Sequence, residues 1–156
     1  MIPLSIVIPI LNEEKNIHIL VKKLNIVLKK NNFKKKEIIF VDDNSQDNTS
    51  KIIKKLQMKD KNLKLIIRKA KYQDLSKSCS LGFRKAKYKN ILVMDGDLQH
   101  PPEHIKFLAK KFLKNEADVV VGSRNLLVKK SPGLGLLRYL SSISIIYLIN
   151  FFLENK

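Results

Sequence analysis

The 156-residue sequence contains a single cysteine and few aromatic residues, which make up 7% of the chain. The lone Cys79 excludes a disulfide within the chain and suits a reducing compartment. Because the aromatic residues do not alternate with basic ones, a stacking platform for single-stranded nucleic acid is not indicated. Helix-turn-helix, zinc-finger and aromatic RNA-binding motifs are absent as well. We therefore expect no nucleic-acid partner, and a basic nucleic-acid-binding domain is the weakest alternative.

Glycine-rich phosphate loops are also missing. Neither G-x-G-x-x-G nor G-x-x-x-x-G-K-[ST] occurs among the five glycines, which argues against a dinucleotide oxidoreductase and a P-loop enzyme. A phosphorylated ligand would instead need a metal and arginines, because a guanidinium pairs with phosphate through two parallel hydrogen bonds. Arg124 and Arg138 are the candidates, and Arg138 is the only charged residue between Lys130 and Glu154.

Acidic residues are scarce, 14 against 31 basic ones, so the net charge is +17. A basic surface attracts nucleic acid, anionic membranes or phosphorylated ligands, although lysines spread over helix surfaces are the ordinary interpretation. The N-terminus has no basic start or small-residue cleavage site, so it is predicted to be a strand and not a signal peptide. The apolar stretch Tyr139–Leu153 is short of the roughly 20 residues of a spanning helix. It predicts a buried or interfacial helix.

Apolar strand-like runs alternate with helical patterns along the chain, and 44% of the residues are hydrophobic. This length and composition predict one domain with a proper core. The predicted strands are Leu4–Ile8, Glu37–Val41, Leu63–Ile67, Asn90–Met94 and Asp118–Val121. The predicted helices are Glu13–Lys30 with Asn12 as its N-cap, Asp47–Met58, Leu75–Ala86 and Pro101–Asn115. Such alternation predicts an α/β fold, a mostly parallel sheet with helices on both faces.

Polar residues follow four of these strands, at the edge where parallel sheets bind ligands. The segments are Asn12–Glu14, Asp42–Ser45, Asp95–Asp97 and Gly122–Arg124. Asp95 and Asp97 share one face of an extended backbone, and Gly96 between them permits close approach. Two carboxylates suit Mg²⁺ or Mn²⁺ whose other ligands are water and phosphate oxygens, with Gln99 as a further oxygen donor. The alternative is a turn that caps the next helix.

The sequence resembles family-2 glycosyltransferases of the GT-A fold, in particular dolichyl- and polyprenyl-phosphate mannosyltransferases. The matching stretches are SIVIPILNEEKNI, EIIFVDDNSQDNT, LSKSCSLGFRKAK, ILVMDGDLQHPPE, and VVVGSRN followed by LLRYLSS. The resemblance implies transfer of a hexosyl group, first of all mannose from GDP-mannose, to a polyprenyl or dolichyl phosphate with a divalent metal. UDP-glucose is the alternative donor.

The resemblance also implies a role for each matching residue. Asp97 would bind Mg²⁺ or Mn²⁺ with help from Gln99 and Asp95, and Asp97 and Arg124 would carry the catalysis. The acceptor phosphate would be held by Arg138 and Ser141. The residues implied to bind the nucleotide sugar are Pro9, Leu11, Glu13, Val41, Asp43, Asp95, Gly96, Asp97 and Arg124.

Two departures from the family pattern shape the remaining expectations. The family usually has an aromatic residue where this chain has Leu11, and it continues with an acceptor-side segment that this sequence does not contain. We therefore expect a donor-binding domain over residues 1–135 and an apolar helix over 136–156 that begins an incomplete acceptor side. The alternatives are an enzyme peripheral to the cytoplasmic membrane face and a nucleotide-sugar-binding fragment without turnover that needs a partner chain.

Overall fold

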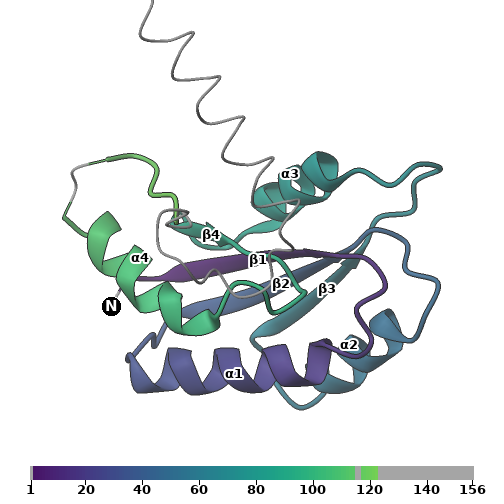
Figure 1. The fold of residues 1–156 in the computed structure, drawn as a ribbon, viewed down its shortest axis with the longest axis horizontal. Helices are drawn as coiled ribbons and strands as arrows, with labels where there is room; N and C mark the ends of the chain where they lie inside the picture. Colours follow the sequence, from purple (N-terminus) through teal and green to yellow (C-terminus); the bar gives the residue numbers. More distant parts are fainter. Residues whose placement is uncertain (1, 115–116, 123–156) are drawn as a thin grey trace, which may run out of the picture.

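The computed structural model describes residues 2–114 and 117–122. Strands and helices alternate along the described chain (Figure 1). The strands are β1 (Leu4–Ile10), β2 (Lys36–Asp42), β3 (Leu63–Ile67) and β4 (Ile91–Val93). The helices are α1 (Ile17–Lys30), α2 (Thr49–Gln57), α3 (Leu75–Lys85), a 3-10 turn η1 (Pro102–His104) and α4 (Ile105–Phe112).

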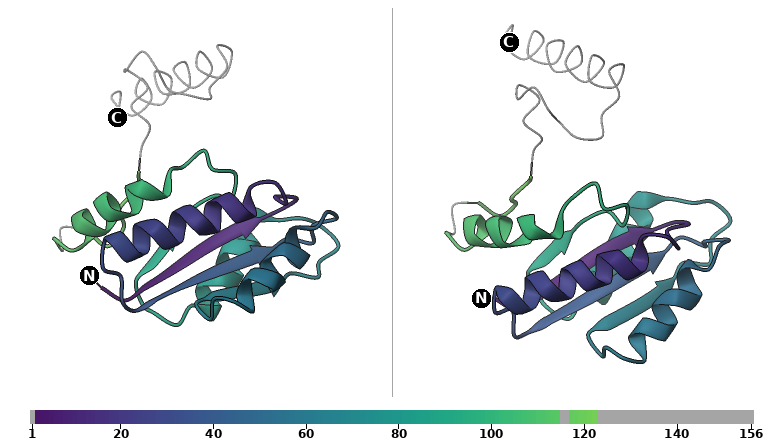
Figure 2. Two further views of the ribbon diagram at one scale, coloured as in Figure 1. Left: turned by 90° about the horizontal axis from the view of Figure 1, so that it is seen from below. Right: turned by 60° about the horizontal axis from the view of Figure 1, so that its bottom comes forward.

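The four described strands form one parallel sheet in the order β3-β2-β1-β4. Helices α1, α2 and α4 cover one face and α3 covers the other (Figures 1 and 2). The predicted α/β class, a parallel sheet with helices on both faces, is therefore confirmed. Because all strands point the same way, their carboxyl ends meet at one edge.

The side chains of β1 alternate between two cores. Ile6 and Ile8 belong to the larger one, which α1 completes with Leu20 and Leu24. Val7 lies on the other face in a small cluster with Ile39 and Val41, against which Leu81 of α3 packs. A continuous apolar run such as SIVIPI is what a strand buried on both faces requires.

Helix α3 approaches β1 closely at Gly82. A Cβ built on Gly82 would collide with Cγ1 of Val7 and lie 3.2 Å from Cγ2 of Val41. Any larger residue would push α3 off the sheet, and α3 contributes to the site described below.

Two expectations are wrong, and the first concerns the start of the first helix. Asn12 does not cap this helix: its φ is 56°, α1 begins at Ile17, and Asn16 is the N-cap residue.

The second concerns the fifth strand. The predicted strand Asp118–Val121 is not formed. Val119 and Val121 are 74% and 80% exposed, and β4 pairs with β1 alone among the described strands. Without a neighbouring strand, an apolar run of three valines has no hydrogen-bond partners that would hold it extended.

The other bounds differ by a few residues from the expectation. The helix predicted over Pro101–Asn115 is a 3-10 turn followed by α4, which ends at Phe112. Among the described residues, no helix has the length and apolar character that crossing a membrane requires. The expected division at residue 135 stays a prediction, and the predicted helix over 136–156 lies outside the described residues.

Candidate functional site

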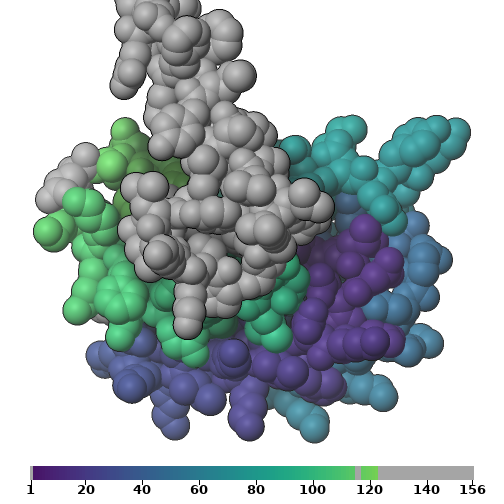
Figure 3. Space-filling model, viewed as in Figure 1, coloured from purple at the N-terminus to yellow at the C-terminus, as the bar shows by residue number. Residues whose placement is uncertain are grey.

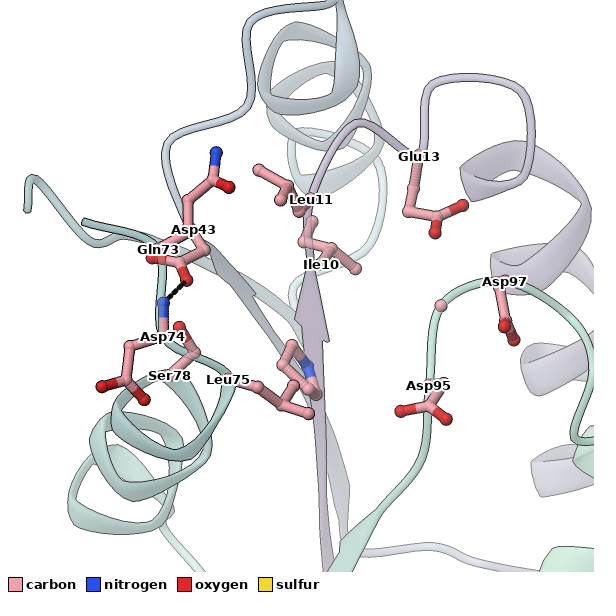
Figure 4. Close-up of a pocket in the computed structure, with 12 residues that line it drawn as sticks. Ile10, Leu11, Glu13, Asp43, Gln73, Asp74, Leu75, Ser78, Asp95 and Asp97 are labelled. Atoms are coloured by element: carbon pink, nitrogen blue, oxygen red, sulfur yellow. Dashed lines mark hydrogen bonds between the residues drawn. The ribbon is translucent and has the colours of Figure 1, made fainter. Parts of the chain in front are cut away.

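An open hollow of about 360 Å³ lies at the carboxyl edge of the sheet. Its volume falls in the range of about 300–1,000 Å³ that small-molecule sites occupy. Figure 4 shows one wall from β2 and α3, a facing wall after β4, and the end of β1 between them. The lining residues are Pro9, Ile10, Leu11, Glu13, Asp43, Gln73, Asp74, Leu75, Ser78, Asp95, Gly96 and Asp97.

The first wall, which we call the β2 wall (Asp43, Gln73, Asp74, Leu75 and Ser78), is anchored by Asp43 at the end of β2. Its Oδ1 accepts a hydrogen bond from Nε of Arg68 at 2.6 Å, and its Oδ2 accepts one from the backbone N–H of Asp74 at 2.6 Å (Figure 4). Arg68 also donates to the carbonyl of Tyr72 at 2.8 Å. The carboxylate therefore fixes the segment that leads from β3 into α3.

Asp74 is also the N-cap of α3. Its side chain accepts a hydrogen bond from the backbone N–H of Lys77 at 3.0 Å, which satisfies one of the free donors of a helix start. This backbone hydrogen bond, with the nearby charge of Lys77, holds the pKa of Asp74 below its usual value. The first turn of α3 is thus fixed from two sides.

The loops that follow β1 and β2 are joined by hydrogen bonds, and they lie against each other in Figure 3, in purple and blue. The backbone N–H of Glu13 donates to Oγ1 of Thr49 at 2.8 Å, and that of Glu14 donates to Asp47 at 3.1 Å. Glu14 in turn accepts from the backbone N–H of Asn48 at 2.9 Å. Burial opposes ionisation of Asp47, but hydrogen bonds from Thr49 and Glu14 outweigh it and lower its pKa.

The second wall, which we call the β4 wall (Asp95, Gly96 and Asp97), follows β4. The side chain of Asp95 is 52% exposed, and its Oδ2 lies 3.5 Å from Nε2 of His100. Asp97 accepts a hydrogen bond from the backbone N–H of Gln99 at 2.9 Å. A Cβ on Gly96 would come within 2.8 Å of Cγ2 of Ile10, so this position favours glycine. The glycine lets the two aspartates approach the end of β1.

The donor set of the β4 wall fits a divalent cation held jointly with a ligand. Asp95 and Asp97 offer hard carboxylate oxygens, which Mg²⁺ and Mn²⁺ prefer. Among the described residues, no three His, Cys, Asp or Glu side chains form a metal-binding group. Two carboxylates without a third suit a cation whose remaining ligands are water and phosphate oxygens.

Most of the nucleotide-sugar residues predicted from the sequence line the hollow together. Two predicted residues do not: Val41 is fully buried under α3, and Gln99 lies in the loop beyond Asp97. Arg124, Arg138 and Ser141 lie outside the described residues. The residues that the structure brings together are Pro9, Leu11, Glu13, Asp43, Asp95, Gly96 and Asp97.

The sequence analysis missed the contribution of β3 and α3. It identified polar segments after four strands but none after β3, which is followed by Arg68, a base that acts through Asp43. An acid just before a helical pattern is an N-cap signal, and Asp74 before Leu75 could have been identified in that way. Nothing in the sequence signalled Ser78, whose position in the hollow depends on how α3 packs.

A parallel sheet with a polar hollow at its carboxyl edge is the architecture of an α/β protein that binds a ligand at its strand ends. The chain belongs to glycosyl transferase family 2, whose sequence profile matches residues 5–138. It is 38% identical over 120 residues to a dolichol-phosphate mannosyltransferase of Pyrococcus furiosus, covering 77% of this chain and 32% of that protein. A dolichol-phosphate mannosyltransferase of Saccharomyces cerevisiae is 33% identical over 132 residues, with 85% and 46% covered.

The relatives also include an undecaprenyl-phosphate 4-deoxy-4-formamido-L-arabinose transferase of Pseudomonas fluorescens, 31% identical, with 78% of this chain and 35% of that protein covered. Among solved structures, S. aureus TarS has a TM-score of 0.59 at 26% identity, covering 83% of this chain and 24% of that one. The GT-A fold is thereby confirmed. The chain spans between about a third and a half of the length of these curated relatives.

Proposed function

We propose that this chain is the donor-binding part of a glycosyltransferase that moves a hexosyl group, first of all mannose from GDP-mannose, to a polyprenyl or dolichyl phosphate. The names of the relatives support a lipid-phosphate acceptor, since they are dolichol-phosphate and undecaprenyl-phosphate transferases. UDP-glucose is the alternative donor, because related enzymes share the same motifs.

The observation that carries the proposal is the opposition of the two walls across the end of β1 (Figure 4). The β2 wall presents hydrogen-bonding groups on a fixed backbone, which suits the nucleoside of a donor. The β4 wall presents two aspartates, which suit a cation on the diphosphate. A nucleotide sugar has both parts in one molecule, so a single donor would contact both walls.

The residues of the β4 wall would hold the cation, with Asp97 and Asp95 as ligands and Gln99 as a further oxygen donor. Bound there, Mg²⁺ or Mn²⁺ would act as a Lewis acid that stabilises the leaving diphosphate. Arg124 would add positive charge beside the developing charge of the leaving group. A phosphate acceptor has a second pKa of about 6 and is mostly ionised at neutral pH, so its attack on the sugar needs no strong base.

The acceptor side of the proposal rests on residues that match the family pattern. Arg138 and Ser141 would contact the phosphate of the acceptor. The net charge of +17 supports peripheral association with anionic lipid at the cytoplasmic membrane face. A second candidate function is nucleotide-sugar binding without turnover until a partner chain completes the acceptor side.

Nucleotide binding is tested by thermal unfolding of the chain with GDP, UDP and GDP-mannose, each with and without Mn²⁺. A ligand at 100 times its dissociation constant adds about 2.7 kcal/mol to the free energy of unfolding. We expect such a gain with one base and Mn²⁺, and its loss in Asp97→Ala. An equal gain in Asp97→Ala would contradict the metal assignment, and the absence of any gain in the wild-type chain would contradict the donor site.

Turnover is tested separately, by incubating the chain with GDP-mannose or UDP-glucose, Mn²⁺ and a polyprenyl phosphate. Formation of the glycosyl lipid supports the transferase, and its sensitivity to Asp97→Ala ties it to the β4 wall. Nucleotide binding without any glycosyl lipid would favour the second candidate function.

A further inference from the structure

Ser78 of α3 has a buried side-chain hydroxyl that lacks a hydrogen-bond partner. The residue is fully buried, and its Oγ makes no hydrogen bond to any described group. Serines inside helices commonly bond back to the carbonyl four residues earlier, which can also accept the backbone N–H. The hydroxyl of Ser78 makes no such bond to the carbonyl of Asp74, which accepts the backbone N–H of Ser78 at 3.0 Å. A buried hydroxyl without a partner destabilises the fold, so the hydroxyl calls for an explanation other than stability.

The other buried side-chain atom without a hydrogen bond among the described residues is Oε2 of Glu37. This atom lies 2.6 Å from Nζ of Lys64, so it has a charged partner. Glu37 is at the opposite end of β2 from Asp43, away from the hollow. Among the described residues, Ser78 is therefore the one that both lines the hollow and has a buried polar atom without a hydrogen-bond partner.

The surroundings of Ser78 suit a flat ring with a polar edge. Pro9 and Leu75 contribute apolar surface to the hollow, and Gln73 contributes an amide next to Asp43 (Figure 4). Asp43 already accepts hydrogen bonds on both oxygens, from Arg68 and from the N–H of Asp74. The buried group without a partner on this wall is thus the hydroxyl, a neutral donor and acceptor.

We propose that the hydroxyl of Ser78 hydrogen-bonds the polar edge of the donor's nucleobase and helps to select that base. The inference rests on the proposed function, because it assigns the β2 wall to the nucleoside of a nucleotide sugar. In the proposed function the phosphates of the donor would lie toward Asp95 and Asp97. Figure 4 shows these two residues on the wall opposite α3, so the base would lie next to α3. A site that hydrogen-bonds its substrate through a buried group discriminates against analogues that leave the group unpaired.

The test is titration of the full chain with GDP, UDP, CDP and ADP in the presence of Mn²⁺, for the wild type and Ser78→Ala. The substitution should weaken the best-bound nucleotide about fivefold, as expected for one neutral hydrogen bond. The affinities of the poorly bound nucleotides should change less than twofold, so the difference in affinity between the best-bound nucleotide and the others becomes smaller. Ser76→Ala, an exposed serine of the same helix, is the matched control and should leave every affinity unchanged.

Thermal unfolding without nucleotide separates this role from a structural one. Removing an unpaired buried hydroxyl should leave the stability of Ser78→Ala equal to or above that of the wild type. Lower stability with unchanged affinities, or an equal loss with all four nucleotides, would overturn the inference while the proposed function stands. If the wild type bound none of the four nucleotides, both the proposed function and the inference would be overturned.

Discussion

The ends of β2 and β4 both carry a pair of acids, but the partners of these acids differ. Asp42 and Asp43 are buried, and each accepts hydrogen bonds on both oxygens. Asp95 is half exposed, and its Oδ2 lies 3.5 Å from Nε2 of His100. The same residue type thus serves as a scaffold on one wall and stays open to a ligand on the other.

The strands beneath the two walls also differ in length and in the number of neighbouring strands. β2 has seven residues and pairs with β1 and β3, whereas β4 has three residues and pairs with β1. A carboxylate that already has strong partners gains little from a cation, while an exposed one can exchange water for it. Acids at strand ends are therefore of two kinds: some hold the backbone of the site in place, and others are open to bind a ligand. The number of hydrogen bonds and ion pairs that a carboxylate already makes distinguishes the two kinds.

The largest difference between the walls should follow removal of one acid from each. Asp43→Ala leaves the guanidinium of Arg68, 12% exposed, without its partner, and breaking a buried pair in this way costs about 3–5 kcal/mol. Asp95→Ala removes a half-exposed carboxylate and should change the free energy of unfolding by less than about 0.5 kcal/mol. Urea unfolding of the two variants measures both values.

Asp43→Asn is the matched control for that pair of variants. An asparagine oxygen can still accept a hydrogen bond from the N–H of Asp74. The decrease in the free energy of unfolding of Asp43→Asn should therefore lie between the decreases of Asp43→Ala and Asp95→Ala. Equal losses in Asp43→Ala and Asp95→Ala would show that the two walls are anchored alike, and the division between scaffold and ligand acids would fail.

A smaller difference should appear when a methyl group is added at a glycine behind each wall. Gly82→Ala meets Val7 and Val41 under α3, and overpacking of a core costs about 1–3 kcal/mol. The gain of about 1 kcal/mol in helix propensity offsets only part of this cost. Gly96→Ala meets one side-chain methyl of Ile10 at 2.8 Å, which can shift, so its stability should fall by less than that of Gly82→Ala.

Nucleotide binding distinguishes these two glycine variants further. Gly96→Ala displaces the backbone between the two aspartates and should weaken the Mn²⁺-dependent part of binding, while Gly82→Ala should weaken binding with and without the metal. If Gly96→Ala were instead less stable than Gly82→Ala, the tighter packing would lie behind the β4 wall, and the comparison of the two walls would be contradicted.

Periodicity predicted the fold well because buried strands and amphipathic helices leave strong patterns in a sequence. Leu63–Ile67 is a strand over its full predicted length, and the helix predicted over Glu13–Lys30 contains α1, which buries Leu20 and Leu24. Termini were predicted less well. Asn12 is a favourable N-cap residue, yet its side chain accepts the N–H of Gln46 from the neighbouring loop, a contact that no local pattern encodes.

The rule that carboxyl ends of parallel strands bind ligands predicted the acids after β1, β2 and β4, and the family resemblance added Pro9, Leu11 and Val41. Neither could identify Ser78, which enters the hollow through the packing of α3 on β1 at Gly82. Nor did the resemblance separate Val41 from its neighbours, since the direction of a strand-end side chain depends on the register of the sheet. Tertiary packing therefore decided which residues near the strand ends face the ligand.

The smallest expected difference concerns pH and belongs to the loops beside the β2 wall. The pKa of Asp47 is held below its ordinary value of about 3.9 by hydrogen bonds from Thr49 and Glu14, which outweigh its burial. A carboxyl with a lowered pKa contributes stability above the unfolded value, and this contribution is lost as the pH falls through the folded value. The free energy of unfolding should therefore fall below about pH 4.

Asp47→Asn tests whether this loop carries part of the acid sensitivity. Asparagine keeps an acceptor for the N–H of Thr49 but cannot be protonated in this range, so the variant should be less stable than the wild type at pH 7. The gap should narrow as the pH falls below about 4, because the wild type then begins to lose the contribution of its ionised carboxylate and the variant has none to lose. Denaturant unfolding at a series of pH values measures the gap, and a gap that is constant from pH 7 to pH 3 would mean that Asp47 stabilises the loops by its shape and not by its charge.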